Sequence, residues 1–283
     1  MAFTFTSCSN GSSSDSDDEK PTYTVTFNPN GGTGAMNPQI FVYGEPQKLS
    51  PNKFTMDGKD FLGWAKTSGG NIAYDDSSEY TIGAADVTLY AVWGKFVTAD
   101  NAATVIAGLE GGTFENPNVY MIRITDKTLT AEQQKEIRTA IRTKTQGWYG
   151  RISLDLSATE LTEIPEEAFS NCRLRGLILP DSLETIGIGS FGYNRFEEII
   201  IPDNVKTIEK GGFYECSSLT TITLPKSLTF IGASAFAGTA LKTVNYKGTQ
   251  AQWEALKANI STTGNDKLIG AKIICTDGVI NGE

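Results

Sequence analysis

The second half of the chain repeats itself every 22 to 23 residues. Three successive stretches align, and they begin at Leu174, Phe196 and Leu219. Three residue types recur at equivalent positions in each of them. These are a proline (Pro180, Pro202 and Pro225), an isoleucine (Ile186, Ile208 and Ile231) and a phenylalanine (Phe191, Phe213 and Phe236). A degenerate copy precedes them at 152–172, and a partial copy starts at Leu241. Because one short repeat cannot bury its apolar residues alone, we expect the copies to stack into a solenoid.

Each repeat predicts one short strand, a proline that ends it, and a tight return that ends in phenylalanine. The return is too short for a full helix. Two columns of strand residues are predicted to point into the core: Leu177, Ile199, Ile222 and Val244, with Leu179, Ile201, Leu224 and Tyr246. The recurring phenylalanines, joined by Phe169 of the first copy, are predicted to form a spine on the other side of that core.

The pattern L-x-x-I-x-(I/L)-P, followed by IG and then AF, resembles the BspA-like leucine-rich repeats of bacterial surface proteins. The resemblance covers 151–249 and implies a leucine-rich-repeat solenoid. Three helices are expected around it: one over Ala99–Leu109, one after Thr130, where a capping-box pattern begins, and one from Thr249. We predict that the flanks, 95–150 and 250–283, form an α/β linker with an N-terminal cap and a C-terminal cap.

The chain from Tyr23 to Trp93 alternates apolar and polar residues in short runs separated by turn residues, which indicates a small β unit. Strands are predicted near 23–27 and over Ile40–Tyr43, Asp60–Ala65, Ile72–Tyr74 and Val87–Trp93. The motifs VTFNPNGGTG at 25–34, FLGW at 61–64 and VTLYAVW at 87–93 resemble the Listeria–Bacteroides repeat, the internalin B-type repeat of bacterial surface proteins. The resemblance implies a β-grasp-like module over 21–94 that serves as a spacer or interaction unit. Trp64 and Trp93 are predicted to anchor its core.

The first 20 residues predict an anchor and a tether. The run Phe5-Thr6-Ser7-Cys8 resembles a bacterial lipobox, which implies lipidation of Cys8. The acidic, serine-rich stretch that follows carries no apolar residue and is expected to be a flexible tether. The alternative is that the start is assigned wrongly and 1–20 is a frayed terminus. With the anchor, the protein is expected to be exported and held at the cell surface in the outer membrane.

The amino-acid composition argues against several kinds of active site and ligand. The chain has no histidine, which removes Ser–His and Cys–His nucleophile pairs and histidine-ligated metals. A net charge of −9 and the lack of a long basic run argue against nucleic-acid binding. The run Gly187–Gly192 matches G-x-G-x-x-G, but the next repeat replaces it, so no dinucleotide site is predicted. We predict no enzyme, no cofactor and no metal site.

The cysteines are expected to be structural. Cys172 and Cys216 occupy equivalent positions two repeats apart, which places their backbones roughly 10 Å apart. A disulfide requires less than about 7 Å between Cα atoms, so these two are predicted to be buried and unpaired. The sequence leaves open whether Cys216 forms a disulfide bond with Cys275.

The outward positions of the strands form the candidate partner-binding face. One column reads Asp155, Ile178, Ile200, Thr223 and Asn245, and the next reads Ser153, Gly176, Glu198, Thr221 and Thr243. Ile178 and Ile200 are apolar where water is expected, and such patches often mark partner sites. The face is therefore assigned to Ile178, Glu198, Ile200, Thr221, Thr223, Thr243 and Asn245. An alternative is given the same weight as a partner site: a loop or the helix at 135–142 covers the two isoleucines, or isolated surface isoleucines carry no function.

The fold class is therefore predicted as mainly β with some α: a small β-grasp-like module followed by a leucine-rich-repeat solenoid with helical caps. The function is predicted to be that of a non-catalytic, monomeric surface lipoprotein. Its partner would be a host extracellular-matrix or plasma protein, or a surface protein of another bacterium. The alternatives are a structural surface or periplasmic scaffold and, least favoured, a carboxylate-dependent polysaccharide hydrolase.

Overall fold

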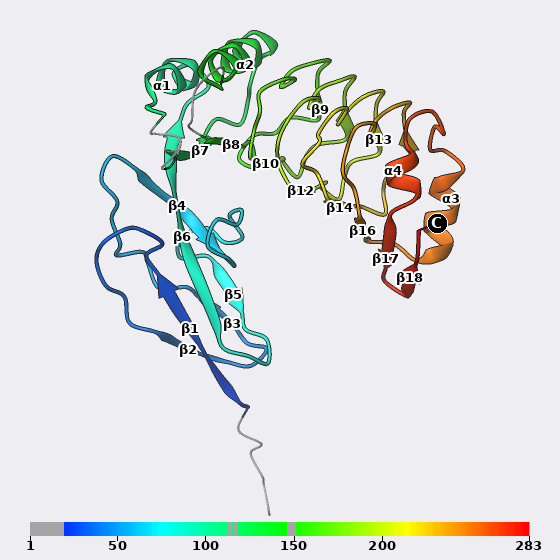
Figure 1. Ribbon diagram of the computed structural model, residues 1–283. Coiled ribbons are helices and arrows are strands. Elements are labelled where there is room, and N and C mark those ends of the chain that lie inside the picture. Colours follow the sequence, from blue (N-terminus) through cyan, green and yellow to red (C-terminus); the bar gives the residue numbers. More distant parts are fainter. Residues whose placement is uncertain (1–19, 112–114, 116–117, 146–150, 283) are drawn as a thin grey trace, which may run out of the picture.

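The computed structural model describes residues 20–111, 115, 118–145 and 151–282. Its described part is mainly β with few helices. Figure 1 shows a β unit from which a curved stack of repeats extends, with helices at both ends of the stack. We call each repeat in this stack a rung. The predicted anchor at Cys8 and the tether lie outside the described residues.

The rung strands follow one another in sequence order but belong to two sheets. Strands β8 (Arg151–Asp155) and β10 (Gly176–Ile178) pair in parallel in one sheet, and β12 (Glu198–Ile200), β14 (Thr221–Leu224), β16 (Thr243–Tyr246) and β17 (Lys272–Cys275) form a parallel ladder in the other. Among the described residues, no ladder pairing joins β10 to β12. Strand β18 (Gly278–Ile280) turns back antiparallel and ends the ladder. Both inward columns predicted from the repeat are buried. The period of the repeat therefore placed the core residues of this region correctly.

The returns form a second parallel ladder that the repeat pattern did not predict. It consists of β9 (Glu163–Ile164), β11 (Thr185–Ile186), β13 (Thr207–Ile208) and β15 (Phe230–Ile231). Beside it the predicted phenylalanine spine is present. The rings of Phe169, Phe191, Phe213 and Phe236 stack with centroids 6.0, 5.7 and 5.4 Å apart, and each is fully buried.

The return turn explains the apparent dinucleotide motif. Gly189 has φ 58°, and the equivalent residues of the neighbouring rungs, Glu167, Gly211 and Ser234, have φ between 53° and 67°. Two residues after each spine phenylalanine, a second residue of the rung is also left-handed: Asn171, Tyr193, Glu215 and Gly238, with φ between 55° and 73°. Glycine adopts this conformation without strain, and Gly189 is the glycine of 187–192 that serves the turn.

Helices lie at both ends of the rungs (Figure 1). They are α1 (Ala102–Gly108), α2 (Ala131–Thr145), α3 (Gln250–Lys257) and the short α4 (Asp266–Ile269). The capping box at Thr130 is confirmed, because its hydroxyl accepts from the N–H of Gln133 while the Gln133 side chain accepts from the N–H of Thr130. Thr249 and Gln252 form the same reciprocal pair before α3.

The N-terminal unit contains β1 (Thr22–Asn28), β2 (Gln39–Val42), β3 (Pro46–Lys48), β4 (Asp60–Ala65), β5 (Glu79–Thr81) and β6 (Val87–Val97). The strand predicted at Ile72–Tyr74 was wrong, since Tyr74 makes only an isolated bridge to Trp64. The short antiparallel pair β3–β5 was not predicted. Trp64 is fully buried and Trp93 is 8% exposed, which confirms both as core residues.

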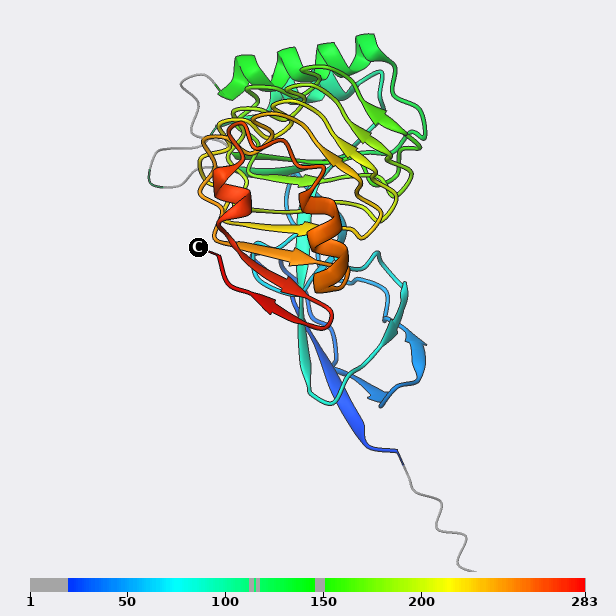
Figure 2. The ribbon, with the colours of Figure 1, turned by 90° about the vertical axis from the view of Figure 1, so that its right-hand side faces the viewer.

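The two regions share one sheet. Strand β6 pairs with β1 and β4 through its first part, and its last residues pair in parallel with β7 (Val119–Ile124), which pairs in turn with β8. Strand β6 thus runs through the predicted boundary between 94 and 95. Gly94 lies at the junction, where a Cβ atom would come within 2.0 Å of the Met121 carbonyl oxygen. Main-chain hydrogen bonds therefore hold the N-terminal unit against the first rung (Figures 1 and 2).

Candidate partner-binding face

The structure aligns the predicted outward columns. Glu198 pairs with Thr221 and Thr221 with Thr243, while Ile200 pairs with Thr223 and Thr223 with Asn245. These side chains share one face of the ladder because alternate strand residues point to the same side. The first strands of that face differ from the later ones in what lies over them.

Ile178 and Ile200 have different surroundings. Ile178 packs against an apolar cluster formed by the N-terminal unit and β7, whose members are Leu62, Ala65, Ile72, Val92 and Met121. Ile200, one rung farther along, is 58% exposed. Helix α2 covers neither residue; its Arg138 donates to the carbonyl of Glu167, which lies in a return. The open alternative is thus resolved residue by residue: Ile178 is partly covered, and Ile200 is open.

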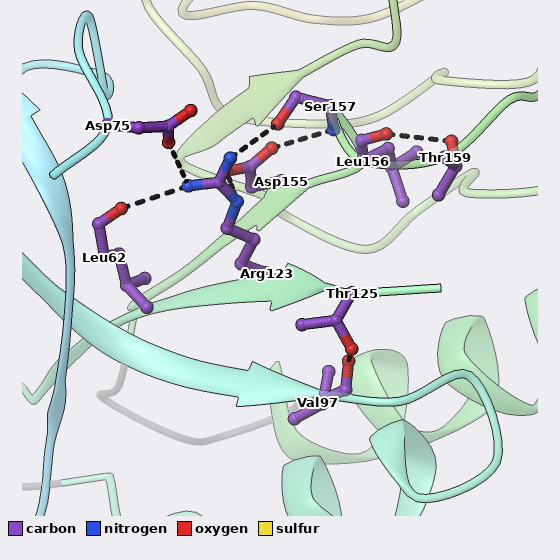
Figure 3. A network of polar contacts seen from close by, with 9 residues as sticks. All are labelled: Leu62, Asp75, Val97, Arg123, Thr125, Asp155, Leu156, Ser157 and Thr159. Carbon is purple, nitrogen blue, oxygen red and sulfur yellow. Dashed lines mark hydrogen bonds and ion pairs between the residues drawn. The ribbon is translucent and has the colours of Figure 1, made fainter. Parts of the chain in front are cut away.

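Asp155, the first member of the same column, is part of a polar network at the junction (Figure 3). Arg123 on β7 lies 3.3 Å from the Asp155 carboxylate and 2.7 Å from that of Asp75, and it donates to the Leu62 carbonyl at 3.0 Å. Asp155 is only 1% exposed, whereas Asp75 is 63% exposed. This network joins a loop of the N-terminal unit to the first rung, and sequence reasoning did not find it.

A cleft of about 640 Å³ lies where the N-terminal unit meets the starts of the rung strands. One wall comes from that unit and includes Lys59 and Asn71, and the other comes from successive rungs and includes Arg151, Arg175, Arg195 and Glu197. Glu198 and Thr221 of the predicted face also line it. The cleft is thus continuous with the candidate face.

The cations of the cleft influence one another. Burial lowers the pKa of Arg175, and the like charges of Arg151 and Arg195 lower it further, while Glu197 opposes them. Burial also lowers the pKa of Lys59, whose Nζ donates to the Val119 carbonyl at 3.1 Å and lies over the Tyr120 ring. Sequence reasoning missed this group, although arginines recur 24 and 20 residues apart near the starts of three copies.

The cysteine predictions can be compared directly. Cys172 and Cys216 are buried and unpaired, as predicted, and Cys275 is also free, so the Cys216–Cys275 bond is not formed. Burial raises the pKa of the Cys172 and Cys216 thiols to about 12. Both therefore stay protonated at neutral pH, where a thiol is a poor nucleophile.

Two adjacent glutamates lie at the cleft. Glu197 precedes β12 and Glu198 begins it, and both are exposed and line the cleft. Within the described ranges no three Cys, Asp or Glu side chains are grouped to hold a metal ion. None of the helices described is long and apolar enough to cross a membrane.

Comparison with known families agrees with both resemblances. Residues 151–256 match the BspA type leucine rich repeat region, in six copies, and residues 23–92 match the Listeria-Bacteroides repeat domain. No curated protein matches the chain. Among solved structures, the chain is similar to a leucine-rich repeat protein from Bacteroides ovatus, with 16% identity and a TM-score of 0.29. That alignment covers 69% of this chain and 59% of the other, so the chain spans less than two thirds of that relative.

Proposed function

Because the chain joins a Listeria–Bacteroides repeat domain to a BspA-type leucine-rich-repeat region, we propose that it is a non-catalytic surface protein whose rung sheet binds another protein. The two repeat families suggest a surface role in protein interaction. The finer proposal is adhesion: the repeats form a solenoid, and its open face binds a host matrix or plasma protein, or a surface protein of another bacterium.

The exposure of Ile200 is the observation that supports this proposal. The N-terminal unit partly covers the outward column at Ile178, whereas one rung farther on an isoleucine is 58% exposed beside Glu198. The threonines and Asn245 that continue both columns offer hydroxyl and amide groups to a partner. An apolar contact within a rim of polar groups is the usual arrangement of a protein-binding surface.

The test uses the full chain, immobilised and exposed to a panel of purified matrix and plasma proteins. Its variant is Ile200→Glu, which places a charge at the centre of the proposed contact. Ile188→Glu is the matched control, because Ile188 is 44% exposed but lies in a return, away from the sheet. We expect saturable binding by the wild-type protein, a loss of about tenfold or more in Ile200→Glu, and little change in the control.

Thermal melting of both variants establishes that neither is unfolded. Binding that survives Ile200→Glu would place the contact elsewhere, for example on the N-terminal unit, and would contradict the assignment of the face. Absence of binding across the panel would favour the scaffold alternative. Ile178 is unsuited to this test, since a charge there would disturb the packing between the two regions.

A further inference from the structure

We propose that the cleft beside the rung sheet binds an acidic segment of the protein partner, with Asp or Glu carboxylates held by Arg151, Arg175 and Arg195. This inference rests on the proposed function and gives the chemistry of its ligand. Its three arginines are not residues of the predicted face, so the two proposals are tested by different variants and can fail separately.

The charge of the cleft is the first argument. Four cations line it, Lys59 and the three arginines, against the carboxylates of Glu197 and Glu198. The chain as a whole carries a net charge of −9, so this local excess of positive charge runs against its composition. A cleft of one sign attracts a ligand of the opposite sign and increases the rate at which it binds.

The second argument is that none of the described carboxylates forms an ion pair with these arginines. Elsewhere on the rungs, Lys206 pairs with Glu184 at 2.8 Å and Lys247 with Asp203 at 2.6 Å. Among the residues that the structure describes, no carboxylate lies within 4 Å of the Arg151, Arg175 or Arg195 guanidinium. Burial lowers the pKa of Arg175 most, the like charges of Arg151 and Arg195 lower it further, and a bound anion would relieve that repulsion.

The spacing of the arginines suits an extended ligand. They come from three successive rungs, and the first two of these contribute the paired strands β8 and β10, about 4.8 Å apart. A guanidinium presents a planar fork of donors that matches a carboxylate in two parallel hydrogen bonds. Several acidic side chains of one segment could therefore engage successive rungs.

A protein segment fits this site better than an anionic glycan. Trp93, an aromatic residue of the cleft, is 8% exposed and donates its Nε1–H to the Pro29 carbonyl at 2.8 Å, so its ring offers little surface for stacking on a sugar. Ile200 lies on the same strand as Glu198, which lines the cleft, and offers an apolar contact outside the cleft itself. The combination favours a segment in which acidic residues stand close to an apolar one.

The experiment measures binding of the full chain to two labelled peptides by fluorescence anisotropy. One peptide is short and rich in Glu and Leu, and in the other every Glu is replaced by Gln. The variant is Arg175→Glu/Arg195→Glu, and the matched control is Lys226→Glu/Lys257→Glu, which changes the net charge equally at exposed sites outside the cleft. Heparin serves as the competing sulfated glycan, and melting curves establish folding.

We expect the Glu peptide to bind at least about tenfold more tightly than the Gln peptide, and the cleft variant to lose at least about tenfold in affinity. The control should stay within about twofold, and binding should weaken between about 50 and 500 mM NaCl. Equal binding of the two peptides, or an equal loss in the control, would overturn the proposal. So would arginine-dependent binding of heparin without binding of the Glu peptide, which would assign the cleft to a sulfated glycan.

The two proposals are separated by their readouts. If Ile200→Glu abolishes capture of a panel protein while no arginine-dependent peptide binding is seen, the sheet still binds a protein and the cleft inference is wrong. If the Glu peptide binds through the arginines while no panel protein is captured, the cleft inference is supported and the proposed partner class fails.

Discussion

Replacing Arg123 with methionine tests how strongly the N-terminal unit is joined to the rungs. Arg123 is 15% exposed, and its guanidinium contacts Asp155, Asp75 and the Leu62 carbonyl (Figure 3). Methionine keeps much of the length of the side chain but removes the charge and all of these contacts. The Asp155 carboxylate, which is 1% exposed, would then be buried without a cation.

The expected loss follows from that burial. Removing one partner of a buried ion pair destabilises a protein by about 3–5 kcal/mol, because the remaining charge is left uncompensated. The contact with Asp75 adds less than about 1 kcal/mol, since that carboxylate is 63% exposed and screened by water. We therefore expect Arg123→Met to lower the free energy of unfolding by about 4 kcal/mol, and Asp75→Asn to lower it by less than about 1 kcal/mol.

A second variant separates the charge from the shape. In Arg123→Met/Asp155→Asn neither charge is present, and the asparagine oxygen can still accept from the Ser157 N–H, as Asp155 does at 2.9 Å. We expect this double variant to recover about half of the loss. Urea unfolding, followed by circular dichroism and tryptophan fluorescence, measures the free energy of unfolding of the wild type and of the three variants. A loss below about 1 kcal/mol in Arg123→Met, or a double variant less stable than the single one, would refute the reasoning.

Two further predictions concern the junction and the anchor. Gly94→Ala should lower the free energy of unfolding by about 3 kcal/mol, because the new Cβ atom would collide with the Met121 carbonyl and separate β6 from β7. Gly83→Ala is the control, since a Cβ atom at Gly83 meets no atom within 4 Å. In the same urea titration it should change the free energy of unfolding by less than about 0.5 kcal/mol. Cys8→Ser should abolish the incorporation of labelled palmitate in a bacterial host while Cys275→Ser leaves it unchanged; equal labelling of both variants would contradict the lipid anchor.

Periodicity explains why so much of the rung region was predictable. The 22- to 23-residue spacing alone placed the inward columns and the phenylalanine spine, since each rung must offer the same apolar positions to its neighbours. Local signals were as informative at the helix starts, where Thr130 forms the expected capping box and a helix begins after Thr249 as expected. Two-residue strands such as β11 escaped prediction because they are too short to show any alternation.

What the sequence could not reveal depends on residues far apart in the chain. Its repeats determined the rung, the core and the outward columns, because these follow from period and polarity within one copy. Only the tertiary structure decided that β6 continues into the sheet of the first two rungs and that Ile178 is partly covered while Ile200 is open. It also decided that Lys59 lines one cleft with arginines from three rungs. These features arise from packing between the two regions, and no pattern within either region encodes that packing.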